Sequence, residues 1–140
     1  MRSMVDGSNP FSYSIRVYVE DTDAGGIVFY ANYLKYMERA RTELLRTLGF
    51  DKPALFGDLQ FVVRQVDMLY HQPAVLDDWI AVTAILTKVS RVSFEMQQQV
   101  YRGAELLVEG GVKVACVSVD SKRPIAMPEL IRNALRNYLC

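Results

Sequence analysis

The sequence predicts an α+β domain in which one antiparallel sheet of five or six strands curls around a single long helix. Three observations support this fold class. Apolar residues recur at spacings of three and four from Tyr30 to Leu48, as in a helix with one buried face. Five other stretches alternate apolar and polar residues as half-buried strands do, and most follow one another through short connections. Because no second layer of helices is predicted, the sheet must bury its apolar face on the one long helix.

The elements follow one another in a simple order. A half-buried strand is predicted at Tyr13–Glu20, with Ile15, Val17 and Val19 on its buried side. The long helix comes next, and Gly49 stands where a left-handed residue ends a helix. Its predicted buried stripe consists of Tyr30, Leu34, Met37, Ala40, Leu44 and Leu48.

The second half of the chain predicts the remaining strands. Asp51–Asp58 reads as a loop or a short turn of helix, and the predicted strands are 60–70, 79–89, 92–101 and 105–120. Gly110-Gly111 inside the last strand predicts a bulge or a strong bend. A final helix is predicted from Pro128, with Leu130, Ile131, Ala134, Leu135 and Tyr138 as its apolar stripe. The complete arrangement is the architecture called a hotdog fold.

Composition sets outer limits on organisation and partners. A chain of 140 residues with 51% hydrophobic residues predicts one domain, 11–140, after a loose N-terminal segment, 1–10. The 16 basic and 16 acidic residues give zero formal net charge, so we expect no nucleic-acid partner. No apolar run reaches the roughly 20 residues of a membrane span. Cys116 and Cys140 form no disulfide framework or metal-ligand spacing, which favours a reducing, cytoplasmic location.

Two carboxylates stand directly before the long helix. Asp21 and Asp23 precede Gly25-Gly26, and two glycines allow a sharp turn that leaves the first N–H groups of the helix free. A carboxylate beside such amides suits attack on a carbonyl group, because the amides stabilise negative charge on oxygen. An Asp before a helix is more often an N-cap, and the spacing alone leaves both roles open.

Other catalytic groups are weaker candidates. The chain has no G-x-S-x-G nucleophile elbow. The only histidine, His71, stands at a strand end and favours a structural role, and Cys116 in an alternating run favours a buried, inert thiol. Asp23 is therefore the best catalytic candidate, acting as a nucleophile or as a general base.

The acidic loop and the helix together carry a resemblance to a known family. The segments DTDAGGIVFYANY (21–33) and ERARTE (38–43), with FVVR (61–64) and later matches at 73–74 and 76–78, resemble acyl-CoA thioesterases of the 4-hydroxybenzoyl-CoA thioesterase type. The nearest branch looks like the one encoded beside the Tol-Pal system of Gram-negative bacteria. That branch often has His where this chain has Tyr30, and here the segment 26–30 looks more like the 4-hydroxybenzoyl-CoA enzyme.

The resemblance implies a cytoplasmic hotdog thioesterase that assembles as a homodimer or homotetramer with sites between subunits. It places the catalytic carboxylate on Asp23 and the oxyanion donor on the backbone amide of Tyr30. No cofactor or metal is expected, since coenzyme A is part of the acyl-CoA substrate. The expected substrate-binding residues are Gly26, Val63, Arg64, Lys88, Ser90 and Arg91.

The turn Lys88–Arg91 offers two cations and a hydroxyl for the phosphates of coenzyme A. Arg64 and Lys122-Arg123 are further candidates, and all of them are equally compatible with solvated surface charges. Two other functions remain open at this stage. One is a hotdog acyl dehydratase, which a lone His71 argues against, and the other is a non-catalytic acyl-binding or scaffolding protein. The sequence leaves the acyl group open between short-chain and aromatic.

Overall fold

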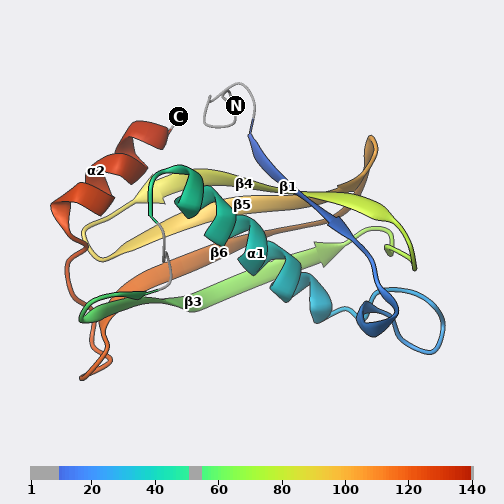
Figure 1. Cartoon of the computed structure of the whole chain (residues 1–140), viewed down its shortest axis with the longest axis horizontal. Helices are drawn as coiled ribbons and strands as arrows, with labels where there is room; N and C mark the ends of the chain where they lie inside the picture. Colours follow the sequence, from blue (N-terminus) through green and yellow to red (C-terminus); the bar gives the residue numbers. More distant parts are fainter. Residues whose placement is uncertain (1–9, 51–54, 140) are drawn as a thin grey trace.

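The computed structural model describes residues 10–50 and 55–139 and shows a curled sheet with one long helix against it (Figure 1). Residues 1–9 of the predicted N-terminal segment 1–10, residues 51–54 and Cys140 lie outside the described residues. The elements in chain order are β1 (Phe11–Arg16), the 3₁₀ turn η2 (Val19–Asp21), α1 (Asn32–Thr47), β2 (Leu55–Phe56), β3 (Leu59–Tyr70), β4 (Trp79–Val89), β5 (Ser93–Arg102), β6 (Glu105–Ser118) and α2 (Glu129–Tyr138). None of the helices among these residues has the length and apolar character needed to cross a membrane.

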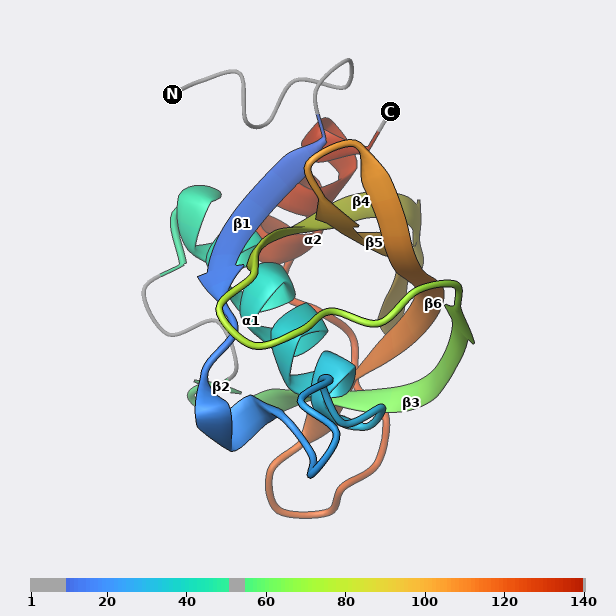
Figure 2. The same ribbon diagram turned by 90° about the vertical axis from the view of Figure 1, so that its right-hand side faces the viewer.

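All strand pairs are antiparallel, and the sheet has the order β1-β4-β5-β6-β3-β2. Figure 2 shows this sheet wrapping around α1, which confirms the predicted hotdog architecture. Tyr36, Met37 and Ala40 of α1 pack in one buried cluster with Ile80 and Val100 of the sheet. The sheet curls because α1 is the main apolar surface available to its inner face.

The buried face of α1 is rotated from the predicted stripe. Met37, Ala40 and Leu44 are buried as predicted, whereas Leu34 and Tyr30 are exposed, Tyr30 by 64%. Tyr33 and Tyr36 take their place against the sheet. Aromatic side chains fill more of the space under a curled sheet, and the Tyr33 hydroxyl finds a hydrogen-bond partner there, accepting from the Ala74 N–H at 3.0 Å.

The first strand is shorter than predicted. β1 ends at Arg16, Val17 is still fully buried, and Val19 is 73% exposed, so its predicted burial is wrong. The cause is Asp21, whose Oδ2 accepts the Tyr18 N–H at 2.9 Å and draws the chain into the turn η2. A local side-chain bond to the backbone competes here with continued strand pairing.

Gly110 and Gly111 were predicted to mark a bulge or a strong bend, and the bulge is wrong. Both residues are paired in register with β3 on one side and with β5 on the other. A Cβ atom on Gly110 would lie 2.2 Å from the Asp67 carbonyl oxygen, so glycine is needed for close approach of β3 rather than for a bulge. The irregularity of β3 lies instead between Val63 and Gln65, which leaves Arg64 as the extra residue.

The second helix closes one end of the core. Ile131, Leu135 and Tyr138 are buried in a cluster with Phe94 of β5, as the predicted stripe required. Leu130 is 76% exposed, contrary to prediction, because it lies in the first turn, beside Glu129 and away from the sheet. In the region predicted as loop or helical turn, β2 forms a two-residue strand that pairs only with the start of β3.

Candidate active site

The acidic segment folds back on itself as a tight loop between η2 and α1. Thr22 and Val28 form an isolated antiparallel bridge, the Asp23 N–H donates to the Ile27 carbonyl at 2.9 Å, and the Gly26 N–H donates to the Asp23 carbonyl at 3.0 Å. Gly26 has φ +81°, in the left-handed region where glycine carries little strain. The two glycines therefore close the loop and fix the backbone of Asp23.

The Asp23 side chain is exposed on this loop, and one of its two carboxylate oxygens is hydrogen-bonded. Oδ1 accepts the Gly25 N–H at 2.8 Å, which orients the group. Among residues 10–50 and 55–139, Oδ2 accepts no hydrogen bond, and no cation pairs with the carboxylate. One oriented oxygen thus remains able to take a proton or to attack an electrophile.

Asp21, two residues earlier, is in the opposite situation. It is buried, Oδ2 accepts the Tyr18 N–H at 2.9 Å, and Oδ1 accepts from Asn32 Nδ2 at 3.0 Å. Because Asn32 is the first residue of α1, Asp21 anchors the start of the helix. The N-cap alternative for Asp23 is wrong, since α1 has Ala31 at the cap position and no side-chain cap.

At the start of α1, the backbone amides of Tyr30 and Ala31 have no acceptor among the described residues. The Asn32 N–H donates to Phe29 O at 2.8 Å, and the Leu34 N–H donates to Ala31 O at 3.1 Å. The Tyr30 N–H has no acceptor in the part of the chain that the structure describes, while the Tyr30 carbonyl accepts from the Tyr70 hydroxyl at 3.0 Å. A free N–H at the positive end of a helix is the type of donor that stabilises an oxyanion.

An aromatic pocket of about 280 Å³ opens beside this amide. Tyr70 packs edge-on against Tyr33, with ring centroids 5.7 Å apart, and against Tyr30 at 6.4 Å. At the rim, His71 Nε2 lies 2.7 Å from Glu109 Oε2, which gives His71 the structural role expected from the sequence. The lining residues are Ile27, Val28, Tyr30, Tyr33, Tyr70, His71, Gln72 and Pro73.

Val63 and Arg64 face opposite sides of the sheet, as consecutive residues of a strand do. Val63 lines an apolar groove of about 330 Å³ between α1 and β3, with Leu34 and Val66. Arg64 lies instead with Lys113 and Ser93 around a hollow of about 210 Å³ on the other side. Within one copy, Val63 and Arg64 therefore line different hollows and do not face the same one.

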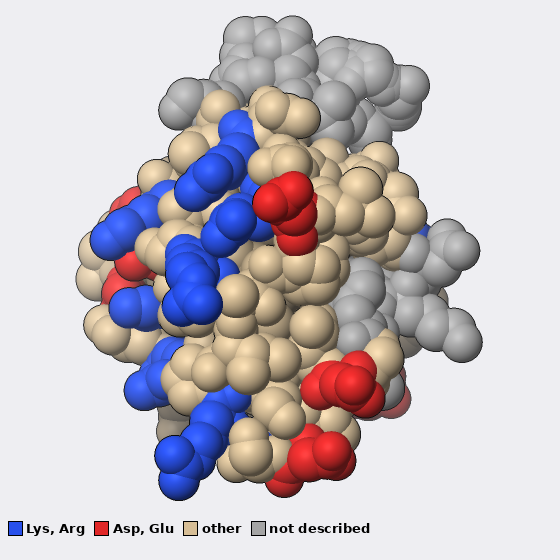
Figure 3. All heavy atoms as spheres, turned by 90° about the vertical axis from the view of Figure 1, so that its left-hand side faces the viewer, with Lys and Arg blue, Asp and Glu red and all other residues tan. Residues whose placement is uncertain are grey.

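The predicted phosphate contacts gather at the other end of the molecule. Lys88 and Arg91 are exposed and pair with no carboxylate in the described ranges. The turn is held by a bond from the Ser90 N–H to Ser93 O at 2.7 Å and from the Met127 N–H to Arg91 O at 3.0 Å. Figure 3 looks onto this end, where Lys and Arg side chains form a band.

Within one chain this basic end and the acidic loop are separated by the full length of the sheet. The loop that carries Asp23 lies at the right of Figure 1 and the connection from β4 to β5 at the left. The structure therefore groups Asp23, Gly26 and Tyr30 at one end and Lys88, Ser90 and Arg91 at the other. It does not bring the two groups together in a single copy.

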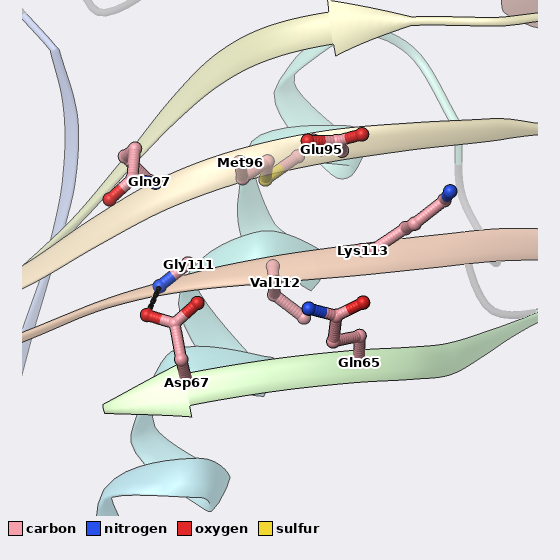
Figure 4. Close-up of a pocket in the computed structure, with 8 residues that line it drawn as sticks. All are labelled: Gln65, Asp67, Glu95, Met96, Gln97, Gly111, Val112 and Lys113. Atoms are coloured by element: carbon pink, nitrogen blue, oxygen red, sulfur yellow. Dashed lines mark hydrogen bonds between the residues drawn. The ribbon is translucent and has the colours of Figure 1, made fainter.

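A further hollow of about 180 Å³ lies on the outer face of the sheet (Figure 4). Asp67 and Gln97 flank it, and the Gly111 N–H donates to Asp67 Oδ1 at 3.2 Å. None of the predicted site residues lines it. Over the described residues, no group of three His, Cys, Asp or Glu side chains could hold a metal ion. Cys116 is buried, and burial raises the pKa of its thiol, as expected for an inert cysteine.

Sequence reasoning missed Tyr33 and Tyr70 as parts of the site. Tyr70 lies in the alternating run with Val66 and Met68, which predicted its face but not its partner. Its bond to Tyr30 joins residues 40 positions apart, so no local pattern reveals it.

Comparison with known proteins gives a consistent result. The family model described as "Thioesterase superfamily" matches residues 25–109. The chain is 40% identical over 131 residues to the acyl-CoA thioesterase YbgC of Haemophilus influenzae, covering 92% of this chain and 96% of that protein. It is also 40% identical over 123 residues to the acyl-CoA thioester hydrolase YbgC of Escherichia coli O157:H7, covering 86% and 92%.

Solved structures show the same architecture. A probable thioesterase from Bartonella henselae superimposes with a TM-score of 0.75 at 33% identity, covering 84% of this chain and 96% of that chain. The gentisyl-coenzyme A thioesterase BH1999 superimposes with a TM-score of 0.81 at 26% identity, covering 89% and 98%. Both likenesses cover more than four-fifths of this chain.

Proposed function

The chain belongs to the thioesterase superfamily, and from this premise we propose that it hydrolyses the thioester of a short-chain or aromatic acyl-CoA to the free acid and coenzyme A. It is an acyl-CoA thioester hydrolase, in keeping with relatives that carry this activity in their names. One observation supports the mechanism. Among the described residues, the Asp23 Oδ2 atom and the Tyr30 N–H have no hydrogen-bond partner, and they are located at the two ends of one short loop.

The reaction needs few groups. In the general-base route, Asp23 takes a proton from water as the water oxygen bonds to the thioester carbonyl carbon. The carbonyl oxygen becomes an oxyanion that the Tyr30 N–H stabilises, and collapse breaks the carbon–sulfur bond and releases coenzyme A as thiolate. In the nucleophilic route, Asp23 itself displaces the thiolate to form an anhydride, which water then hydrolyses. Both routes use the same two residues, with Gly26 fixing the loop between them.

The pocket beside Tyr30 is the proposed acyl site. Its volume of about 280 Å³ exceeds the roughly 150 Å³ of a cavity that holds benzene, so an aryl or a short alkyl group fits. Tyrosine edges and faces favour stacking or edge-on contact with an aromatic ring. The aromatic character of the walls therefore favours an aromatic acyl group.

The coenzyme A phosphates are proposed to bind at the basic end of a second copy. Residues 61–70 of β3 form a free sheet edge, because β2 covers only its first two positions. Exposed edges are commonly paired with a partner strand. If two copies pair through β3 about a twofold axis, the antiparallel arrangement places the basic end of one beside the acidic loop of the other. Lys88, Ser90 and Arg91 of one copy would then serve Asp23 of its partner, and Val63 and Arg64 would lie next to the shared edge.

The experiment that tests the catalytic assignment compares Asp23→Asn with wild type in a thiol-release assay over a panel of acyl-CoAs. Asparagine can still accept the Gly25 N–H but cannot act as base or nucleophile, so turnover should fall by about 10²-fold or more. Asp120→Asn is the control, because Asp120 is also exposed but lies in the turn after β6, outside the acidic loop and outside β3.

A folded Asp23→Asn protein that releases coenzyme A at the wild-type rate would contradict the assignment. Absence of thiol release by the wild type from every member of the panel would favour an acyl-binding or scaffolding role instead. Activity on an enoyl- or hydroxyacyl-CoA without thiol release would point to a dehydratase.

A further inference from the structure

The Tyr30 carbonyl stands outside the hydrogen-bond ladder of α1. Ala31 is the N-cap of α1, so Tyr30 lies just before the helix and its carbonyl is not part of the helix hydrogen bonds. The Leu34 N–H donates to Ala31 O at 3.1 Å, so the helix starts with a tighter turn. Tyr30 O accepts instead from the Tyr70 hydroxyl at 3.0 Å. A side chain from the end of β3 thus gives this carbonyl a donor that the helix does not provide.

The Tyr70 ring is held in place from two sides. It contacts Tyr33 at 5.7 Å and Tyr30 at 6.4 Å, both edge-on. Tyr33 is itself immobilised, because it is buried and its hydroxyl accepts the Ala74 N–H. Ala74 in turn accepts the Val28 N–H at 2.9 Å, which connects this cluster to the acidic loop. Burial raises the pKa of Tyr70, which keeps its hydroxyl protonated and able to donate.

Given the proposed function, we propose that Tyr70 is a positioning residue that holds the Tyr30 backbone so that its N–H remains free and aimed at the oxyanion. The hydroxyl fixes the plane of the peptide between Tyr30 and Ala31, and so restrains the backbone of Tyr30. Tyr70 acts through the backbone of Tyr30 and does not itself react.

This role predicts a specific defect in Tyr70→Phe. The phenyl ring keeps the contacts with Tyr33 and Tyr30 but leaves Tyr30 O without its donor, so the peptide between Tyr30 and Ala31 is free to turn. A displaced oxyanion donor weakens transition-state binding more than substrate binding. We expect kcat to fall by about tenfold while KM stays within about twofold of wild type.

Tyr138→Phe is the matched control. The Tyr138 hydroxyl also donates to a main-chain carbonyl, that of Ala84 at 3.4 Å, but on α2 at the opposite end of the core. Its loss should leave kcat and KM unchanged. Equal kcat values for Tyr70→Phe and wild type would overturn the proposal, and so would a rise in KM with kcat retained, which would make Tyr70 only a wall of the pocket.

A second measurement follows the backbone directly and needs no substrate. In amide NMR spectra, Tyr70→Phe should shift the Tyr30, Ala31 and Leu34 resonances strongly, while Tyr138→Phe leaves them in place. Unchanged Ala31 and Leu34 resonances would refute the positioning role even in an inactive protein. Wild-type protein without thioesterase activity would instead refute the proposed function, so the two failures are distinguishable.

Discussion

At the residue scale, Asp21 and Asp23 share one side-chain type but differ in environment. Asp21 is buried, and its two carboxylate oxygens accept hydrogen bonds from the Tyr18 N–H and from the Asn32 side chain. Removing a partner from such a buried group typically costs about 1–3 kcal/mol. Asp23 is exposed and keeps one oxygen open. A substitution at Asp21 is therefore a stability variant, and the exposed Asp120 is the better control for Asp23.

Tyr36 makes the protein sensitive to alkaline pH. Burial, with the negative charge of Asp21 as a second cause, raises the pKa of Tyr36 above its ordinary 10.0. Below that pH both folded and unfolded chains keep the proton, and above it only the unfolded chain loses it. The free energy of unfolding should thus fall as pH rises past about 10, and Tyr36→Phe should flatten this fall.

Urea unfolding at several values between about pH 8 and about pH 11 measures the effect. Tyr18→Phe is the control, because the Tyr18 side chain is 60% exposed. Parallel stability curves for wild type and Tyr36→Phe would show that Tyr36 contributes nothing to alkaline unfolding.

At the element scale, β3 combines several tasks. Its bulge at Arg64 turns Val63 and Val66 toward α1 and Arg64 toward the other face. Its last residue, Tyr70, bonds the start of α1. Within residues 10–50 and 55–139, its outer edge is unpaired over most of its length. A partner strand on that edge would therefore lie next to both the apolar groove and the residue that holds the proposed oxyanion donor.

The connection between β4 and β5 gives a kinetic prediction. If Lys88 and Arg91 bind phosphate, the double alanine variant should raise KM by about tenfold with little change in kcat, because phosphate contacts are equal in ground and transition states. Added salt should weaken the wild type in the same direction. Steady-state kinetics with one short acyl-CoA measure both, and Arg136→Ala on α2 is the control. Identical KM values would return these cations to the role of solvated surface charges.

At the scale of the whole molecule, zero net charge conceals a division between two ends. The basic band of Figure 3 lies at one end of the sheet and the acidic loop at the other. An acyl-CoA carries its phosphates far from its thioester, so both ends are needed for one substrate. Pairing of two copies through β3 supplies both at each site.

The assembly prediction is a homodimer, or a tetramer of two dimers, at micromolar concentration in sedimentation experiments. Val66→Lys on the free strand should shift the protein toward monomer and reduce activity, since it places a charge in the shared groove. Leu130→Lys, on an equally exposed apolar position of α2, should do neither. A wild-type monomer would rule out a shared site.

Mixed assemblies test the sharing itself. Asp23→Asn and the Lys88/Arg91 double alanine variant should each be defective alone. After mixing and exchange, half of the dimers would be hybrids with one intact site of two, restoring about a quarter of wild-type kcat/KM. No recovery in exchanged mixtures would place both groups of residues in one chain.

The elements that depend on local residue patterns are readable from the sequence alone. The alternation of apolar and polar residues located β3, β4, β5 and β6 to within two residues, because successive residues of a half-buried strand face the core and the solvent in turn. The same motif residues identified the family, and the acidic glycine loop identified the region of the site. These features depend on residues close together in the chain.

Which side chains and backbone amides near the acidic loop are exposed or lack a hydrogen-bond partner depends on the tertiary structure. Val19 and Leu34 looked apolar and buried, but the turn held by Asp21 and the tyrosine face of α1 left them exposed. The sequence predicts a bulge or a strong bend at Gly110, whereas the structure shows that glycine is needed there because β3 approaches closely. The hydrogen-bond partners of Asp21 distinguish it from Asp23. The Tyr30 carbonyl accepts from the hydroxyl of Tyr70, which lies 40 residues further along the chain. Hydrogen-bond partners across such distances are set by how the sheet folds over the helix, which no local spacing encodes.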